Sequence, residues 1–131
     1  MKTEPSTKPL RFLRLWLVAG WCLIGLVIVL SLVPTPVEPP AFKAQDKALH
    51  LAAYCVLMTW FGAIYQPDRY RRRIGVLLIF MGVVLELAQG ATSYRSLQGL
   101  DMLANGFGVV LGWIIARTRV SDLFVFVESH L

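Results

Sequence analysis

The sequence predicts an all-α fold, a bundle of four transmembrane helices with the N-terminus and the C-terminus in the cytoplasm. Hydrophobic residues make up 56% of the 131 residues and charged residues only 16%. Together with a mean hydropathy of +0.62, this composition is typical of an integral membrane protein. Four apolar runs approach or reach the roughly 20 helical residues that cross a hydrocarbon core. The short stretches between them leave no room for a soluble domain.

Five segments follow from the position of the apolar runs, which cover residues 15–33, 48–65, 74–91 and 100–116. The first ten residues are polar, include Pro5 and Pro9, and are expected to be disordered. The segments are a cytoplasmic lead (1–14), a first transmembrane helix (15–33), a proline-rich outer loop (34–45), a core with three transmembrane helices (46–116) and a cytoplasmic tail (117–131).

The first apolar run is expected to be an uncleaved helix. It follows a basic lead, as in a secretory signal peptide, but it exceeds the usual apolar length of roughly 7–15 residues and no small-x-small cleavage site closes it. The loop after it, VPTPVEPPAFKAQ, contains four prolines, which favour extended polyproline geometry and oppose a helix. We expect a stiff spacer there, with a docking surface for an extracytoplasmic partner as the alternative.

The net charge of +5 is explained by topology. Of the 13 Lys and Arg residues, ten fall on the side that holds both termini and three on the other. This bias follows the positive-inside rule and predicts cytoplasmic termini, so no nucleic-acid partner is expected. In this interpretation the inner loop QPDRYRRR fixes the topology. Membrane lipids are its expected partners, with their anionic head groups attracted to Arg69, Arg71, Arg72 and Arg73.

The last apolar run and the tail need separate arguments. Residues 100–116 contain Asp101 and Asn105, and we count them as a span because Asp101 lies at their very end. The tail segment DLFVFVESHL is too short to span and is expected to lie at the interface, with His130 far from the polar residues of the spans. Cys22 and Cys55 fall within spans, where thiols behave as small apolar groups, so no disulfide is expected.

Polar residues of the spans converge on one leaflet. With this topology, Glu86 lies about five residues, or roughly 7.5 Å, below the outer end of the third helix, and His50 lies at a similar depth in the second. A carboxylate facing lipid costs about 2.5–3.5 kcal/mol, so such residues should face the bundle and find partners. The expected outer-leaflet pocket comprises Asp46, Lys47, His50, Tyr54, Glu86, Gln89, Arg95, Asp101 and Asn105.

Helical spacing places these residues on shared faces with glycines. At about 100° per residue, the polar residues of the third and fourth helices share a stripe with glycines deeper in the bilayer. Small residues let helix backbones approach closely, as in the GxxxG motif. The glycines expected to pack helices are Gly75, Gly82, Gly108 and Gly112.

The same residues permit a purely structural role. The carboxylates and the basic side chains of the pocket nearly cancel in charge, and protonation of His50 would make the sum zero. A self-neutralising network that locks helices together needs no substrate. The alternative is a water-accessible pocket that binds or processes a molecule.

The polar residues form two motif blocks, Asp46-Lys47-x2-His50-x3-Tyr54 and Glu86-x2-Gln89-x5-Arg95-x5-Asp101-x3-Asn105-x2-Gly108-x3-Gly112. In these blocks, from about residue 46 to 116, the chain resembles the VanZ-like family of small bacterial membrane proteins. The resemblance implies a multi-pass protein of the bacterial cytoplasmic membrane. It also implies a role in the cell envelope, since the name-giving member is associated with resistance to teicoplanin, a glycopeptide that acts outside the cell on cell-wall precursors.

Three functions are weighed. The first is an envelope factor that binds a lipid-linked or lipophilic molecule at the outer leaflet, with Arg95 or Lys47 as the anion contact and an effect on teicoplanin sensitivity. The second is an intramembrane enzyme acting on a lipid head group, with His50, Glu86 and Asp101 as candidate catalytic residues. The third and least favoured is a small multidrug-type exporter, whose membrane glutamate lies in the first helix, whereas Glu86 lies in the third.

No cofactor and no metal are expected. The cluster has a single histidine and no His-x3-His pair, and the candidate nucleophiles for an enzyme are only Ser93 and Ser96 in the outer loop. Whether the protein is an enzyme stays open, with a binding role favoured. The residues that offer N and O ligands for a divalent ion are Asp46, His50, Glu86 and Asp101.

Overall fold

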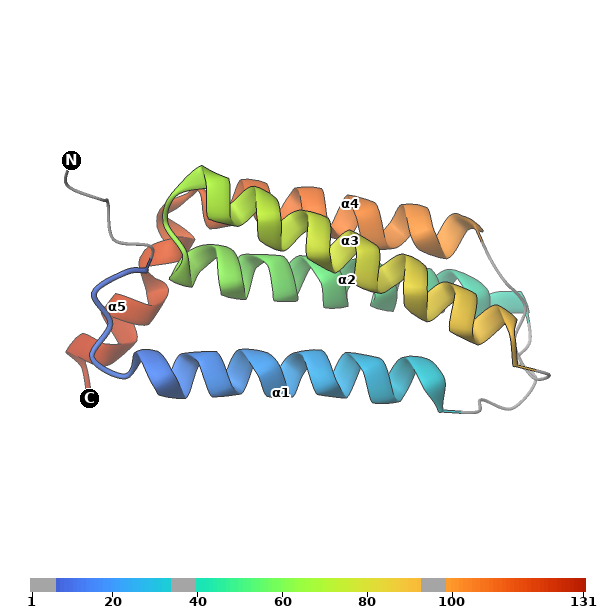
Figure 1. Cartoon of the computed structure of the whole chain (residues 1–131), viewed down its shortest axis with the longest axis horizontal. Helices are drawn as coiled ribbons and strands as arrows, with labels where there is room; N and C mark the ends of the chain where they lie inside the picture. Colours follow the sequence, from blue (N-terminus) through green and yellow to red (C-terminus); the bar gives the residue numbers. More distant parts are fainter. Residues whose placement is uncertain (1–6, 34–39, 93–98) are drawn as a thin grey trace.

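The computed structural model of the chain describes residues 7–33, 40–92 and 99–131 and, within them, all side chains except those of residues 40–44. These residues form five α-helices and one 3-10 helix and contain no β-strand (Figure 1), so the predicted all-α fold is confirmed. The elements are α1 (Leu13–Leu32), α2 (Pro40–Ile64), α3 (Asp68–Gly90), α4 (Gly99–Ala116), the 3-10 helix η1 (Arg119–Asp122) and α5 (Leu123–Ser129).

Four of the helices, α1 to α4, are long and apolar enough to cross a membrane, which confirms the predicted bundle of four spans. Large apolar side chains such as Phe80 and Phe107 point outward and are exposed, as expected for a protein solvated by lipid. In the most apolar 18-residue stretch of α2, 39% of the residues are buried inside the protein, whereas in α1 only 6% are. The centre of the bundle is therefore α2, and α1 packs on its periphery (Figure 1).

The closest helix packing is between α2 and α4. A Cβ atom added at Gly112 would lie 2.5 Å from the Cys55 carbonyl oxygen, and one added at Gly108 would meet the Leu51 carbonyl oxygen. The two backbones thus approach through the glycines of α4, as small residues allow in membrane helix pairs. Around this seam, the buried side chains of Tyr54 and Met58 form the core with neighbours from α3 and α4.

Two helices begin earlier than the apolar runs, which corrects two loop predictions. Helix α2 begins at Pro40, so residues 40–45 of the expected proline-rich loop are helical. Proline is tolerated at the first helical position because its missing N–H would have no partner there. Helix α3 begins at Asp68, so the run from Arg69 to Arg73 lies in its first turns and not in a loop. Pro67 precedes that helix, and the Asp68 carboxylate suits its N-terminal dipole.

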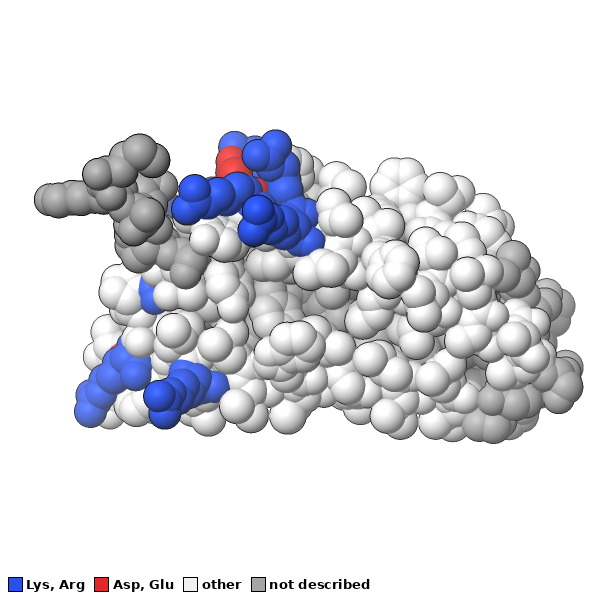
Figure 2. All heavy atoms as spheres, viewed as in Figure 1, with Lys and Arg blue, Asp and Glu red and all other residues white. Residues whose placement is uncertain are grey.

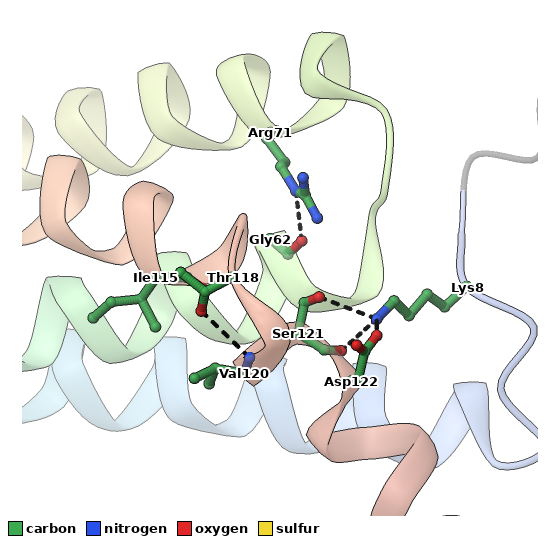
Figure 3. A network of polar contacts seen from close by, with 8 residues as sticks. All are labelled: Lys8, Gly62, Arg71, Ile115, Thr118, Val120, Ser121 and Asp122. Carbon is green, nitrogen blue, oxygen red and sulfur yellow. Dashed lines mark hydrogen bonds and ion pairs between the residues drawn. The ribbon is translucent and has the colours of Figure 1, made fainter.

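Residues 7–10 pack against the end of the bundle, which corrects the expectation of disorder for them, and residues 1–6 of the expected lead lie outside the described residues. The backbone N–H of Lys8 donates to the Ile64 carbonyl (2.9 Å). Its ammonium donates to the Ser121 carbonyl oxygen and forms an ion pair with Asp122, both at 2.6 Å (Figure 3). The chain start and the tail are therefore bound to each other at the end of the bundle where α2 ends.

The tail, for which the sequence predicted no helix, contains the short helix α5. Phe124 is buried and stacks on Trp16 of α1 with ring centroids 4.4 Å apart. Glu128 accepts hydrogen bonds from the backbone N–H groups of Arg11 and Phe12 and from the Trp16 ring. Arg11 and Phe12 directly precede α1, and Trp16 lies in its first turn, so Glu128 fixes the tail to the start of α1.

Candidate functional site

Most of the described basic side chains lie at the end of the bundle where α1 and α3 begin and α2 and α4 end (Figures 1 and 2). There Arg71 donates to the Gly62 carbonyl (2.8 Å) and lies 3.6 Å from Asp68, which is also 3.5 Å from Arg117. The other end, where α2 and α4 begin and α3 ends, holds most of the polar residues predicted for the pocket (Figure 1).

Five of those residues meet between the first turns of α4 and the N-terminal half of α2. The ammonium of Lys47 lies 3.6 Å from an oxygen of Asp101. His50 bridges the two helices, because its Nδ1 lies 3.1 Å from Asn105 Oδ1 and its Nε2 lies 3.8 Å from Asp46 Oδ2. Spacing explains the arrangement, since Asp46 and His50, and Asp101 and Asn105, are each four residues apart and share a helix face.

The two ring nitrogens of His50 face different partners. An amide oxygen only accepts hydrogen bonds, so the contact of Nδ1 with Asn105 Oδ1 is a hydrogen bond in the tautomer that carries the proton on Nδ1. In that tautomer Nε2 is the nitrogen without a proton, and it faces Asp46.

Helix α3 closes the site at Gly82. A Cβ atom there would lie 3.0 Å from Asn105 Nδ2 and 3.2 Å from the Tyr54 hydroxyl, so the absence of a side chain lets both polar groups reach α3. Glu86, one turn further along α3, is 1% exposed. The buried face of α3 also includes Gly75, where an added Cβ atom would lie 3.4 Å from Val109 of α4.

Gln89 serves a different contact from the one expected. Its side-chain nitrogen donates to the carbonyl oxygen of Ser31 at 2.6 Å and so joins α3 to the last turn of α1. Ser31 was not among the predicted residues. A general rule could have indicated this contact. The last four carbonyls of a helix have no partner within the helix, so a buried side-chain amide at the same depth can donate to one of them.

The Tyr54 hydroxyl and one Asp101 oxygen are among the buried polar atoms that have no hydrogen-bond partner within the described residues. That Asp101 oxygen has the Lys47 ammonium as its cationic neighbour. More than about 90% of buried polar groups in proteins are hydrogen-bonded, so each exception calls for a water, an ion or a ligand. The two atoms mark the places where such a partner fits.

The cluster is graded in exposure from the end of the bundle inward. Asp46 and Lys47 keep 31% and 27% of their side-chain surface exposed, His50 keeps 12% and Asp101 only 4%. A network that merely locked the helices could be closed on all sides. This one has an accessible rim and a buried floor.

A divalent cation would find three ligands here. Asp46, His50 and Asp101 each offer one ligand atom, and these atoms lie within 4.8 Å of one another. Glu86, which the sequence analysis adds to such a set, is not in the group. The Lys47 ammonium beside Asp101 already supplies a positive charge and competes with a bound ion, so the residues fit a metal only in part.

Three predicted residues lie outside the described part of the chain: Arg95, as an anion contact, and the candidate nucleophiles Ser93 and Ser96. Comparison of the sequence and structure with family models, with curated proteins and with solved structures gives no match. The class that the fold and the residues define is an all-α protein with four helices able to span a membrane. The resemblance to the VanZ-like family stays a prediction.

Proposed function

We propose that this chain is a VanZ-like factor of the bacterial cell envelope, and that its polar cluster binds the head group of a lipid-linked or lipophilic molecule. The cluster of Lys47, His50 and Asp101 provides a cation, a titratable ring and a carboxylate at one membrane surface. Lys47 is the anion contact among the described residues. An effect on sensitivity to glycopeptides such as teicoplanin follows if the bound molecule is a cell-wall precursor.

The observation that carries the proposal is the buried Tyr54 hydroxyl without a hydrogen-bond partner in the described chain. A helix-locking network uses its polar groups on one another, whereas a binding site leaves some of them to the ligand. Tyr54 lies on the same face of α2 as Asp46 and His50, one turn deeper than His50. Its hydroxyl also sits beside Asn105 and Gly82, so it faces the floor of the cluster.

A second candidate is an intramembrane enzyme acting on a lipid head group. It is favoured by one feature, the contact between His50 Nδ1 and Asn105 Oδ1, because in the tautomer that donates this hydrogen bond Nε2 keeps a lone pair. Histidine is the side chain that most often serves as a general base in enzymes. The same cluster would then hold the head group and accept its proton.

The test uses cells that lack the protein and are complemented by variants at verified equal membrane abundance. The variants are His50→Ala, Glu86→Gln, Asp101→Asn and Tyr54→Phe, and the control is Asp68→Asn at the opposite end of the bundle. Sensitivity to lipophilic glycopeptides and the envelope lipids, measured by mass spectrometry, are the readouts. Tyr54→Phe is the most informative variant because it removes a hydroxyl that no described residue uses.

We expect Tyr54→Phe to accumulate normally and to lose function, while Asp68→Asn behaves as wild type. A lipid that builds up in His50→Ala but not in Tyr54→Phe would favour the enzyme over the binding factor. If Tyr54→Phe and the other cluster variants accumulate and function normally, the proposal is wrong. If the charged variants disappear from the membrane while Tyr54→Phe functions normally, the cluster is a structural lock.

A further inference from the structure

A groove of about 450 Å³ lies on the outside of the bundle between α1 and α3, with part of α2 as its floor. Apolar side chains line most of it, including Trp21 and Ile24 from α1 and Leu77 and Met81 from α3. Small-molecule sites in proteins measure roughly 300–1,000 Å³, so the groove is large enough for a ligand. Figure 2 shows this face, with a recess between the side chains of α1 and those of α3.

One end of the groove is basic. Arg73 is its charged lining residue, and Tyr70 lies beside it, both in the first turns of α3. The other basic residues of this region differ in their contacts. Arg71 is buried against the Gly62 carbonyl, and the Arg69 guanidinium lies 5.0 Å from the centre of the Tyr70 ring. Arg73 is exposed, and no carboxylate of the described chain lies within ion-pair distance of it.

We propose that the groove binds an anionic glycerophospholipid, with an acyl chain between α1 and α3 and the phosphate on Arg73. An apolar groove open to a bilayer is filled by hydrocarbon, because the lipid tails are the solvent there. The charge at its mouth selects the occupant, since a guanidinium binds a phosphate through two parallel hydrogen bonds. The site lies at the end opposite the polar cluster, so this inference does not depend on the function proposed above.

The arrangement also modifies the lipid contacts expected from the sequence. Of the four arginines between Arg69 and Arg73, Arg71 is turned inward and holds the α2–α3 connection together. Arg72 is exposed but does not line the groove. Comparing substitutions at the neighbours Arg72 and Arg73 therefore distinguishes diffuse attraction to an anionic surface from binding at a defined site.

The test is native mass spectrometry of the purified full-length protein in detergent with added phosphatidylglycerol or phosphatidylcholine. We expect wild type to retain one phosphatidylglycerol in preference to phosphatidylcholine. Arg73→Gln should lower this retention by about tenfold, because it removes the charge-assisted hydrogen bonds to the phosphate, whereas Arg72→Gln should change it less than about twofold. Arg73→Lys should keep part of the preference, since it keeps the charge and loses the paired geometry.

A second pair of variants tests the acyl chain. Ile24→Trp fills the groove and should lower phosphatidylglycerol retention, whereas Leu26→Trp adds the same ring at an exposed position of α1 outside the groove and should not. Equal losses in Arg72→Gln and Arg73→Gln would mean diffuse attraction and overturn the proposal. Equal retention of the two lipids by wild type, or no effect of Ile24→Trp, would overturn it as well.

Discussion

Asp101 is the most deeply buried charged residue of the ion pairs at the polar end, and Lys47 is its cationic neighbour 3.6 Å away. Lys47→Gln should destabilise the protein by about 1–3 kcal/mol, because it leaves a buried charged acceptor without compensation. The double variant Lys47→Gln with Asp101→Asn should recover part of the loss, since it removes the stranded charge. The measurement is the free energy of unfolding by denaturant in detergent micelles.

The same double-mutant cycle can contradict this account of the pair. If the effects of Lys47→Gln and Asp101→Asn simply add, the two side chains do not interact in a way that matters for stability. The ion pair with Asp101 would then not compete with a ligand anion for the Lys47 ammonium, and Asp101 would depend on other partners. A large coupling, by contrast, means that a ligand anion must compete with Asp101 for the Lys47 ammonium.

At the scale of elements, the α2–α4 seam depends on the absence of side chains at two glycines. Gly108→Ala should destabilise the bundle by about 1–3 kcal/mol, because the added methyl group meets the α2 backbone, which cannot move aside as a side chain can. Gly106→Ala is the matched control, two residues away on the same helix, where an added Cβ meets nothing within 4 Å. The measurement is thermal unfolding of both variants in one detergent.

The control variant Gly106→Ala has its own expected effect on stability. Alanine favours a helix over glycine by about 1 kcal/mol in general, so Gly106→Ala should be neutral or stabilising. Equal destabilisation by both substitutions would show that helix α4 is not held by close backbone approach. The functional consequence is direct, because Gly108 lies one turn below Asn105 and sets how closely α4 brings Asn105 to His50.

The docking of α5 should depend on pH through two carboxylates. The hydrogen bond and charge of Lys8 lower the pKa of Asp122. Partial desolvation pushes the pKa of Glu128 up, but hydrogen bonds from the Phe12 N–H, the Trp16 ring and the Arg11 N–H outweigh it, so its pKa is lowered overall. A lowered pKa means that the stabilisation is present above the ordinary carboxyl pKa and is lost as the pH falls through the folded value.

Docking should therefore persist at neutral pH and weaken in the acid range, below the ordinary pKa of these groups. Hydrogen exchange of the α5 amides between neutral and acid pH, followed by mass spectrometry, measures it. Glu128→Gln keeps an acceptor oxygen but removes the titration, so its exchange should change less with pH than in wild type. If exchange in Glu128→Gln depends on pH as strongly as it does in wild type, Glu128 is not the group responsible.

For the whole molecule, hydropathy was sufficient to predict the number and nature of the spans, because a bilayer requires long apolar helices whatever they pack against. The sequence also predicted that Asp101 and Asn105 lie on one face of α4, because residues four apart in a helix share a face. The sequence could not predict the bond between Lys8 and Asp122, since nothing local links residues 114 positions apart. Nor could it predict that Gln89 turns to the Ser31 carbonyl, because that choice depends on where α1 ends in space.

The orientation in the membrane is the prediction on which the biological meaning of both ends depends. Ten of the 13 Lys and Arg residues lie on one predicted side, and the positive-inside rule places that side in the cytoplasm. In a background with Cys22→Ala and Cys55→Ala, we expect Ala91→Cys at the polar end to react with a membrane-impermeant maleimide in intact cells. Gln66→Cys, exposed at the basic end, should react only after permeabilisation.

The reverse labelling pattern would put the polar cluster in the cytoplasmic leaflet, where a glycopeptide acting outside the cell could not depend on it. Labelling of both positions in intact cells would indicate dual orientation, which is the behaviour expected of a small multidrug-type exporter. The predicted pattern would instead place the cluster of Lys47, His50 and Asp101 where lipid-linked cell-wall precursors are used. It would also place the Arg73 groove in the cytoplasmic leaflet, whose anionic lipids match its charge.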